Sequence, residues 1–94
     1  MSKYGQLNWI FTGGELNKSI IVTNLNEMRA NLKFDIYFED REPIKELTYT
    51  IAPERVFSFR LDNPICDQQY KLPSGMYTIV INSDLPVVAV LEGL

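Results

Sequence analysis

Near its middle the chain carries the stretch Leu32-Lys33-Phe34-Asp35-Ile36-Tyr37-Phe38-Glu39, in which apolar and polar residues alternate. A β-strand turns successive side chains to opposite faces, so this alternation places one face in a core and the other in water. The same alternation returns in residues 47–51 and 55–61, with Phe57, Phe59 and Leu61 expected inward. This period-two pattern predicts antiparallel strands that are each covered on one side.

Three further runs are almost entirely apolar, at residues 20–22, 77–81 and 87–91. They are rich in β-branched residues and too short for helices, so they suit strands that are covered on both faces. In a chain of 94 residues the second cover can come from another subunit. We therefore expect the last strands to help bury a subunit interface.

Turn-forming residues punctuate the chain at regular intervals. They are Gly13-Gly14, Asn24–Glu27, Asp40–Pro43, Ala52–Glu54, Asp62–Ser74 and Asn82–Pro86. Short strands at this spacing, with no helical periodicity, are typical of a sandwich. We predict a single all-β domain over residues 1–94, an antiparallel β-sandwich of about seven strands.

The composition excludes several classes of protein. A hydrophobic share of 46% is too high for a disordered chain, and a net charge of −3 provides no general attraction to nucleic acid. The single cysteine, Cys66, cannot form an internal disulfide. The N-terminus is polar, and the longest apolar run, Leu85–Leu91, is interrupted by Pro86. These features predict a cytoplasmic protein that is not inserted in a membrane.

The chemistry needed by most enzymes is missing from the sequence. It contains no histidine, the commonest general base, and one cysteine cannot build a thiolate metal cluster. Gly13-Gly14 lacks the spacing of a phosphate-binding loop. Carboxylates at the strand ends, such as Glu39 and Glu54, are expected to be solvated. We expect no enzymatic activity, no cofactor and no metal.

Several short motifs follow one another in a distinctive order. They are Trp9–Leu16, Ser19–Asn24, Tyr37–Pro43, Pro53–Arg55, Phe59–Asp62 and Ser83–Val88. In this order and spacing the chain resembles the sensory rhodopsin transducer family from about Trp9 to Leu91. The resemblance implies a small β-sandwich that assembles as a homotetramer. It also implies one of two roles, relaying a signal from a microbial photoreceptor rhodopsin or binding small molecules such as sugars.

Two segments depart from the pattern of that family. Asn17-Lys18 stands where members commonly carry a His-Glu pair just before the second strand. Residues 91–94 read Leu-Glu-Gly-Leu, where members continue with a Thr-Arg-Leu-Asp-like segment.

Three residues combine a suitable side chain with a nearby turn. Trp9, the only tryptophan, is either a core or interface anchor or a platform on which a sugar ring stacks. Glu15 is either a solvated loop carboxylate or a ligand contact, since it follows two glycines that would allow a ligand to approach the backbone closely. Arg55 shares the parity of Phe57 and Phe59, so it lies at a strand edge or pairs with a carboxylate, and either arrangement suits an anionic or hydroxylated ligand.

Two more candidates belong to the third strand and the turn after it. Tyr37 projects from the polar face and can reach either a ligand or a second subunit, while Arg41 is expected to pair locally with Asp40. We therefore take Trp9, Glu15, Tyr37, Arg41 and Arg55 as the candidate ligand-binding residues. The expected function is a non-enzymatic domain that binds a sugar-like molecule. The alternatives are a transducer that docks on a membrane photoreceptor or another protein, and a structural oligomer subunit without a ligand.

Overall fold

The computed structural model describes residues 4–93, which form six β-strands and no helix. The strands are β1 (Gln6–Gly13), β2 (Lys18–Asn24), β3 (Ala30–Phe38), β4 (Ile44–Ile51), β5 (Arg55–Arg60) and β6 (Tyr77–Gly93). Every strand pair is antiparallel, which confirms the all-β prediction. Within residues 4–93 no helix could cross a membrane.

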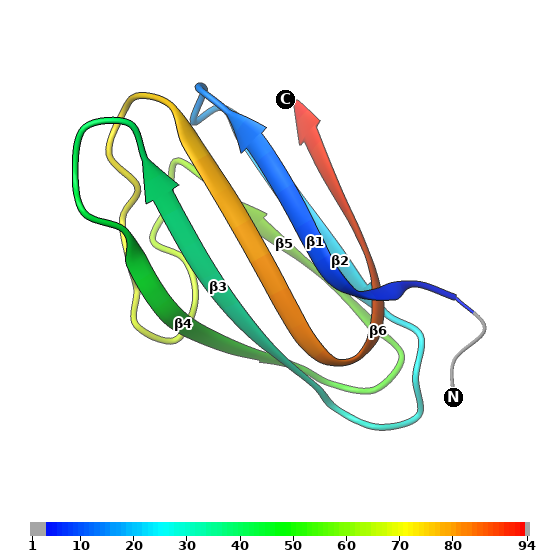
Figure 1. The fold of residues 1–94 in the computed structure, drawn as a ribbon. Helices are drawn as coiled ribbons and strands as arrows, with labels where there is room; N and C mark the ends of the chain where they lie inside the picture. The colour runs from blue at the N-terminus through cyan, green and yellow to red at the C-terminus, as the bar shows by residue number, and fades with distance from the viewer. Residues whose placement is uncertain (1–3, 94) are drawn as a thin grey trace.

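The strands form two layers that share β6 (Figure 1). The first half of β6 lies between β3 and β1, and β4 forms the far edge of that layer. The second half of β6 pairs with β2, and β5 lies on the other side of β2. In Figure 1 the orange part of β6 runs down the near layer, bends, and returns to the C-terminus in the other layer.

The two strands predicted at residues 77–81 and 87–91 are one bent strand, so the sandwich has six strands rather than about seven. The polar residues and Pro86 give Asn82–Pro86 the composition of a turn. Asn82 and Ser83 instead continue the pairing with β3, and pairing with β2 begins at Val88. Pro86 therefore falls between the two ladders, where its missing N–H removes no hydrogen bond. The chain bends at this point instead of reversing.

The core lies between the layers and follows the predicted alternation of β3. Phe34 and Ile36 are fully buried, and the Phe34 ring meets Phe59 of the other layer at a centroid distance of 5.0 Å. The long connection after β5 adds Leu61 and Ile65, both almost completely buried. Each large apolar side chain removed from water in this way contributes about 1.5–3 kcal/mol.

Phe57 is the exception among the residues predicted to point inward. It has the parity of Phe59 but remains 38% exposed, because β4 and β5 form the open side of the sandwich. Its ring packs against Tyr49 at 4.6 Å and Phe59 at 4.7 Å between centroids. The aromatic cluster thus covers the core at this edge.

The Asn24 side chain, close to the bend of β6, forms hydrogen bonds to the connection before β3 and to the end of β4. Its amide is fully buried and donates to the carbonyl oxygens of Met28, Ile51 and Ala52, at 2.9, 3.1 and 3.2 Å. Its carbonyl oxygen accepts hydrogen bonds from both nitrogens of Asn26. The Asn26 amide in turn donates to the Pro86 carbonyl at 2.7 Å.

Candidate functional site

The outer face of the first layer contains a hollow of about 620 Å³ that is lined mainly by polar side chains. Register brings these residues together: Lys33 of β3 lies opposite Thr48 of β4 and opposite Asn82 of β6. We call this site the polar hollow, and its lining residues are Asn31, Leu32, Lys33, Thr48, Tyr49, Thr50, Asp67, Asn82, Ser83 and Asp84.

One wall of the polar hollow is a chain of hydrogen bonds that crosses the layer. The two carboxylate oxygens of Asp84 accept the backbone and side-chain N–H groups of Asn31, each at 2.8 Å. Thr50 Oγ1 donates to the side-chain oxygen Oδ1 of Asn31 at 2.9 Å. An ionised carboxylate offers about four acceptor positions, so Asp84 keeps capacity for further donors.

The opposite wall is the connection after β5, which folds back along the edge of β4. Asp67 N–H donates to the Thr48 carbonyl at 2.8 Å, and Thr48 Oγ1 donates to Asp67 Oδ2 at 3.0 Å. The Gln68 side chain accepts from Thr48 N and donates to Thr48 Oγ1. Both walls are therefore held by hydrogen bonds in the free protein.

Among the residues that the structure describes, Lys33 is the cation that lines the polar hollow. Its ammonium group is 3.6 Å from Glu46, and both side chains are largely exposed, so this pair contributes little to stability. The polar hollow therefore offers ammonium and amide donors, hydroxyl groups that both donate and accept, and carboxylate acceptors. This is the hydrogen-bonding inventory that matches a molecule bearing several hydroxyl groups.

Tyr37 lines a different and smaller hollow, of about 220 Å³, near the end of the first layer where β3 finishes. Its side chain is 40% exposed on the outer face, as predicted, and the Lys45 ammonium lies 5.5 Å from the ring centroid. Phe38 and Tyr77 also line this hollow.

Two other predicted residues lie near the same end. Arg41 donates to Asp40 at 3.1 Å, and its guanidinium is 5.8 Å from the Phe38 ring. The hydrogen bond from Arg41 lowers the pKa of the Asp40 carboxyl and raises that of Arg41. Glu15 contributes its backbone carbonyl, which accepts the Tyr77 hydroxyl at 2.8 Å.

Trp9 lies half-buried on β1, with its ring nearly parallel to that of Phe11 at an interplanar angle of 9°. Its indole N–H donates to the Val87 carbonyl at 2.9 Å, just past the bend of β6. This contact anchors β1 to the bend and uses the one polar group of the ring.

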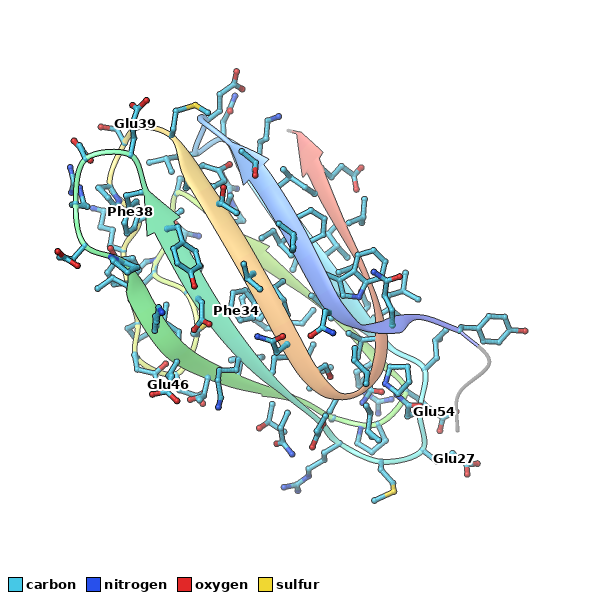
Figure 2. The ribbon with its side chains drawn as sticks, in the orientation of Figure 1. Glu27, Phe34, Phe38, Glu39, Glu46 and Glu54 are labelled. Carbon is cyan, nitrogen blue, oxygen red and sulfur yellow. The ribbon has the colours of Figure 1, made fainter. Side chains whose placement is uncertain are left out.

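Arg55 lies near the bend of β6, at the opposite end of the molecule from Tyr37 and Arg41. It begins β5, where it is opposite Asn24 of β2, and donates to the Glu54 carbonyl at 3.0 Å. Figure 2 shows its neighbour Glu54 and the end of β3 at Glu39 on opposite ends of the molecule. The five predicted residues therefore do not form one site, and their role in ligand binding stays a prediction.

The residues of the polar hollow are not among the candidates that the sequence indicates. The alternation of β3 and β4 does place Lys33, Thr48 and Thr50 on an outer face. The partnership of Asn31 with Asp84 depends on the register between β3 and β6, which no local motif specifies.

Comparison with known proteins assigns the family. The family model described as Anabaena sensory rhodopsin transducer matches residues 15–94. The chain belongs to this family. The match confirms the resemblance found in the motifs, although it begins after Trp9.

Two solved structures extend the comparison within and around the transducer family. The Anabaena sensory rhodopsin transducer superposes with a TM-score of 0.82 at 21% identity, covering 95% of this chain and 97% of that one. A second structure, described as Thermotoga maritima 1070, has a TM-score of 0.78 at 26% identity and covers 93% of this chain and 78% of that one. No curated protein sequence matches this member of the transducer family. At 21% identity the first likeness establishes the fold.

Proposed function

We propose that this member of the transducer family is a non-enzymatic, cytoplasmic sensory domain that binds a small sugar-like molecule in the polar hollow. The observation that carries the proposal is the pair of hydrogen-bonded walls, Asn31 with Asp84 and Thr48 with Asp67, on either side of Lys33. Because both walls are already ordered, a ligand need not fix these side chains on binding, which favours affinity.

Size and chemistry both support a ligand of this class. A volume of about 620 Å³ falls within the usual range of small-molecule sites, about 300–1,000 Å³. Sugar hydroxyl groups donate and accept hydrogen bonds, and the polar hollow offers both kinds of partner. The family, named for a transducer, supports a sensory role in place of catalysis. The family resemblance further suggests that the domain works as a homotetramer.

A thermal-shift screen against sugars, sugar acids, nucleosides and nucleotides tests the proposal. A ligand at 100 times its dissociation constant adds about 2.7 kcal/mol to the native state. For a domain of this size each kcal/mol raises the midpoint by about 4–8 °C, so we expect a clear and saturable shift. No saturable binder across the panel would count decisively against a ligand-binding role.

A matched pair of lysine variants locates the site. Among residues 4–93, Lys33 is the one cation that lines the polar hollow, and Lys33→Met removes it, while Lys45→Met removes an exposed lysine that lies against Tyr37. Loss of a charged hydrogen-bond donor costs about 1.5–3 kcal/mol, so K33M should weaken binding by about 10-fold or more. K45M should bind as the parent does. Equal loss in both variants would place the ligand elsewhere.

The second candidate is a transducer that docks on a membrane photoreceptor or another protein, and the family description favours it. Retention on membranes that contain the photoreceptor, with no shift in the ligand screen, would select this role. If both experiments fail, a structural oligomer subunit without a ligand remains as the interpretation.

A further inference from the structure

The outer face of the first layer carries both hollows, and the register of its strands places their residues in rows. Residues directly opposite one another in antiparallel strands point to the same side of a sheet. β3, the first half of β6 and β1 lie side by side and supply three such rows (Figure 1). We call them the outer rows, and they are Lys33-Asn82-Asn8, Asp35-Val80-Ile10 and Tyr37-Thr78-Thr12.

The outer rows connect the polar hollow with the smaller hollow at Tyr37. Lys33 and Asn82 of the first row line the polar hollow, and all the residues of the third row line the smaller hollow. Lys33 and Tyr37 leave the same face of β3 four residues apart, which corresponds to about 13 Å along a strand. The two hollows therefore lie along one strand, at a separation that a single sugar ring cannot bridge.

The middle row offers apolar surface and a hydrogen-bond acceptor between the two hollows. Ile10 is 68% exposed, and Val80 beside it is half-buried. The C–H groups on the face of a sugar ring gain free energy by covering apolar surface of this kind. One carboxylate oxygen of Asp35 accepts the Glu46 N–H at 2.8 Å, so the carboxylate keeps acceptor positions for hydroxyl groups. A sugar ring between the hollows would therefore find partners for its face and its edge.

The third row combines an aromatic ring with two hydroxyl groups. The Tyr37 side chain is 40% exposed, and the Oγ1 atoms of Thr12 and Thr78 share a hydrogen bond of 2.9 Å. A rigid aromatic ring provides a large apolar surface on which a sugar face can stack. The smaller hollow, of about 220 Å³, falls below the usual size of an independent small-molecule site, about 300–1,000 Å³. It suits one end of a longer molecule.

An extended peptide, the other long molecule that a sheet commonly binds, lacks backbone partners at the outer rows. A peptide that adds to a sheet does so through main-chain hydrogen bonds at a free strand edge. At these rows β6 pairs with β3 on one side and with β1 on the other. Recognition on this face must therefore use side chains, and most of those in the outer rows are polar.

We infer that the polar hollow and the smaller hollow are the two ends of one site for an extended oligosaccharide, which lies along β3 over the outer rows. The inference rests on the proposed function, because it keeps one sugar unit in the polar hollow and specifies that the ligand is a chain. Contacts at both ends of one molecule raise its affinity, since the second contact forms within an existing complex. A nearly straight row of contacts favours a straight chain, such as a β-1,4-linked one.

Isothermal titration calorimetry with sugars of increasing length tests the inference on the full chain. The probes are glucose, mannose, xylose and N-acetylglucosamine, each with its β-1,4-linked dimer, trimer and tetramer. In at least one of these series we expect the trimer to bind about 10-fold more tightly than the monomer, because the trimer reaches the Tyr37 ring.

Substitutions of Tyr37 connect this gain to the smaller hollow. Tyr37→Ala removes the stacking surface and should weaken trimer binding by about 10-fold, to the level of the monomer, while monomer binding stays as in the parent. Tyr37→Phe keeps the ring and should retain most of the gain. Leu25→Ala, at an exposed position in the turn after β2, is the control and should bind every probe as the parent does. Circular dichroism on each variant verifies that the fold is kept.

The outcomes separate this inference from the proposed function. Equal affinity for monomer and trimer in every series that binds would overturn the inference and leave the proposed function standing. A gain with chain length that Y37A leaves intact would also overturn it, since the chain would then run in another direction. If no sugar of any length binds, the proposed function fails and the inference fails with it.

Discussion

At the scale of single residues, Asn24 shows how one polar side chain can stabilise an apolar fold. Its amide satisfies carbonyl groups from two different connections, and within residues 4–93 no buried side-chain nitrogen or oxygen lacks a partner. Leucine would fill much the same volume but would leave those carbonyl groups and the Asn26 N–H without it. A buried polar group that loses its hydrogen-bond partner lowers the stability of the folded protein.

Asn24→Leu should therefore lower the free energy of unfolding by about 2–4 kcal/mol. For a domain of this size that corresponds to a fall in melting temperature of about 10–30 °C, measured by circular dichroism. Asn17→Leu, an exposed position before β2, is the control and should melt with the parent. A melting temperature of N24L within a few degrees of the parent would show that water replaces the lost contacts.

At the scale of elements, the bend of β6 is the feature that makes two layers from one strand. β1 and Gly5, the residue just before it, contact this bend through the Trp9 hydrogen bond to Val87 and a close approach of Gly5 to the Val87 backbone. Gly5 has a φ of 90°, and a Cβ there would collide with the Val87 carbonyl oxygen. Glycine is thus required by both the conformation and the space.

Gly5→Ala should destabilise the protein by about 1–3 kcal/mol and separate the start of β1 from the bend. Because Trp9 is the only tryptophan, its fluorescence reports the change directly, and we expect emission at longer wavelength together with a lower melting temperature. Gly93→Ala serves as control, since a Cβ there meets nothing within 4 Å. Unchanged emission from G5A would contradict the bracing role of β1.

At the scale of the whole molecule, the core is one cluster that both layers and the long connection share. Cys66, in that connection, is 3% exposed, and burial raises the pKa of its thiol to about 12. The ordinary pKa of a thiol is 9.0, so below about pH 9 the thiol is protonated in both the folded and the unfolded chain and does not make stability depend on pH. Stability then falls as pH rises toward 12, because the unfolded chain releases this proton and the native chain retains it.

A thiol-specific reagent should therefore fail to modify native Cys66 at pH 8 and react at once in denaturant. We expect the protection of Cys66 from the reagent to be lost over the same denaturant range in which the Trp9 emission changes, since a single core unfolds as a unit. Replacing Cys66 by alanine removes the reaction and verifies its source. Modification well before the change in fluorescence would mean that the connection opens separately from the sandwich.

Local patterns in the sequence are enough to predict the all-β class, the inward residues of β3 and the family, because period-two alternation and ordered motifs are properties of short segments. The same local patterns misplace one boundary, since Asn82–Pro86 has the composition of a turn but is a bend in a strand that pairs with β3. The polar hollow arises only in the folded chain. Asn31 meets Asp84 through the register of β3 and β6, which are distant in sequence. That register is selected by burial of whole faces, which no single segment encodes.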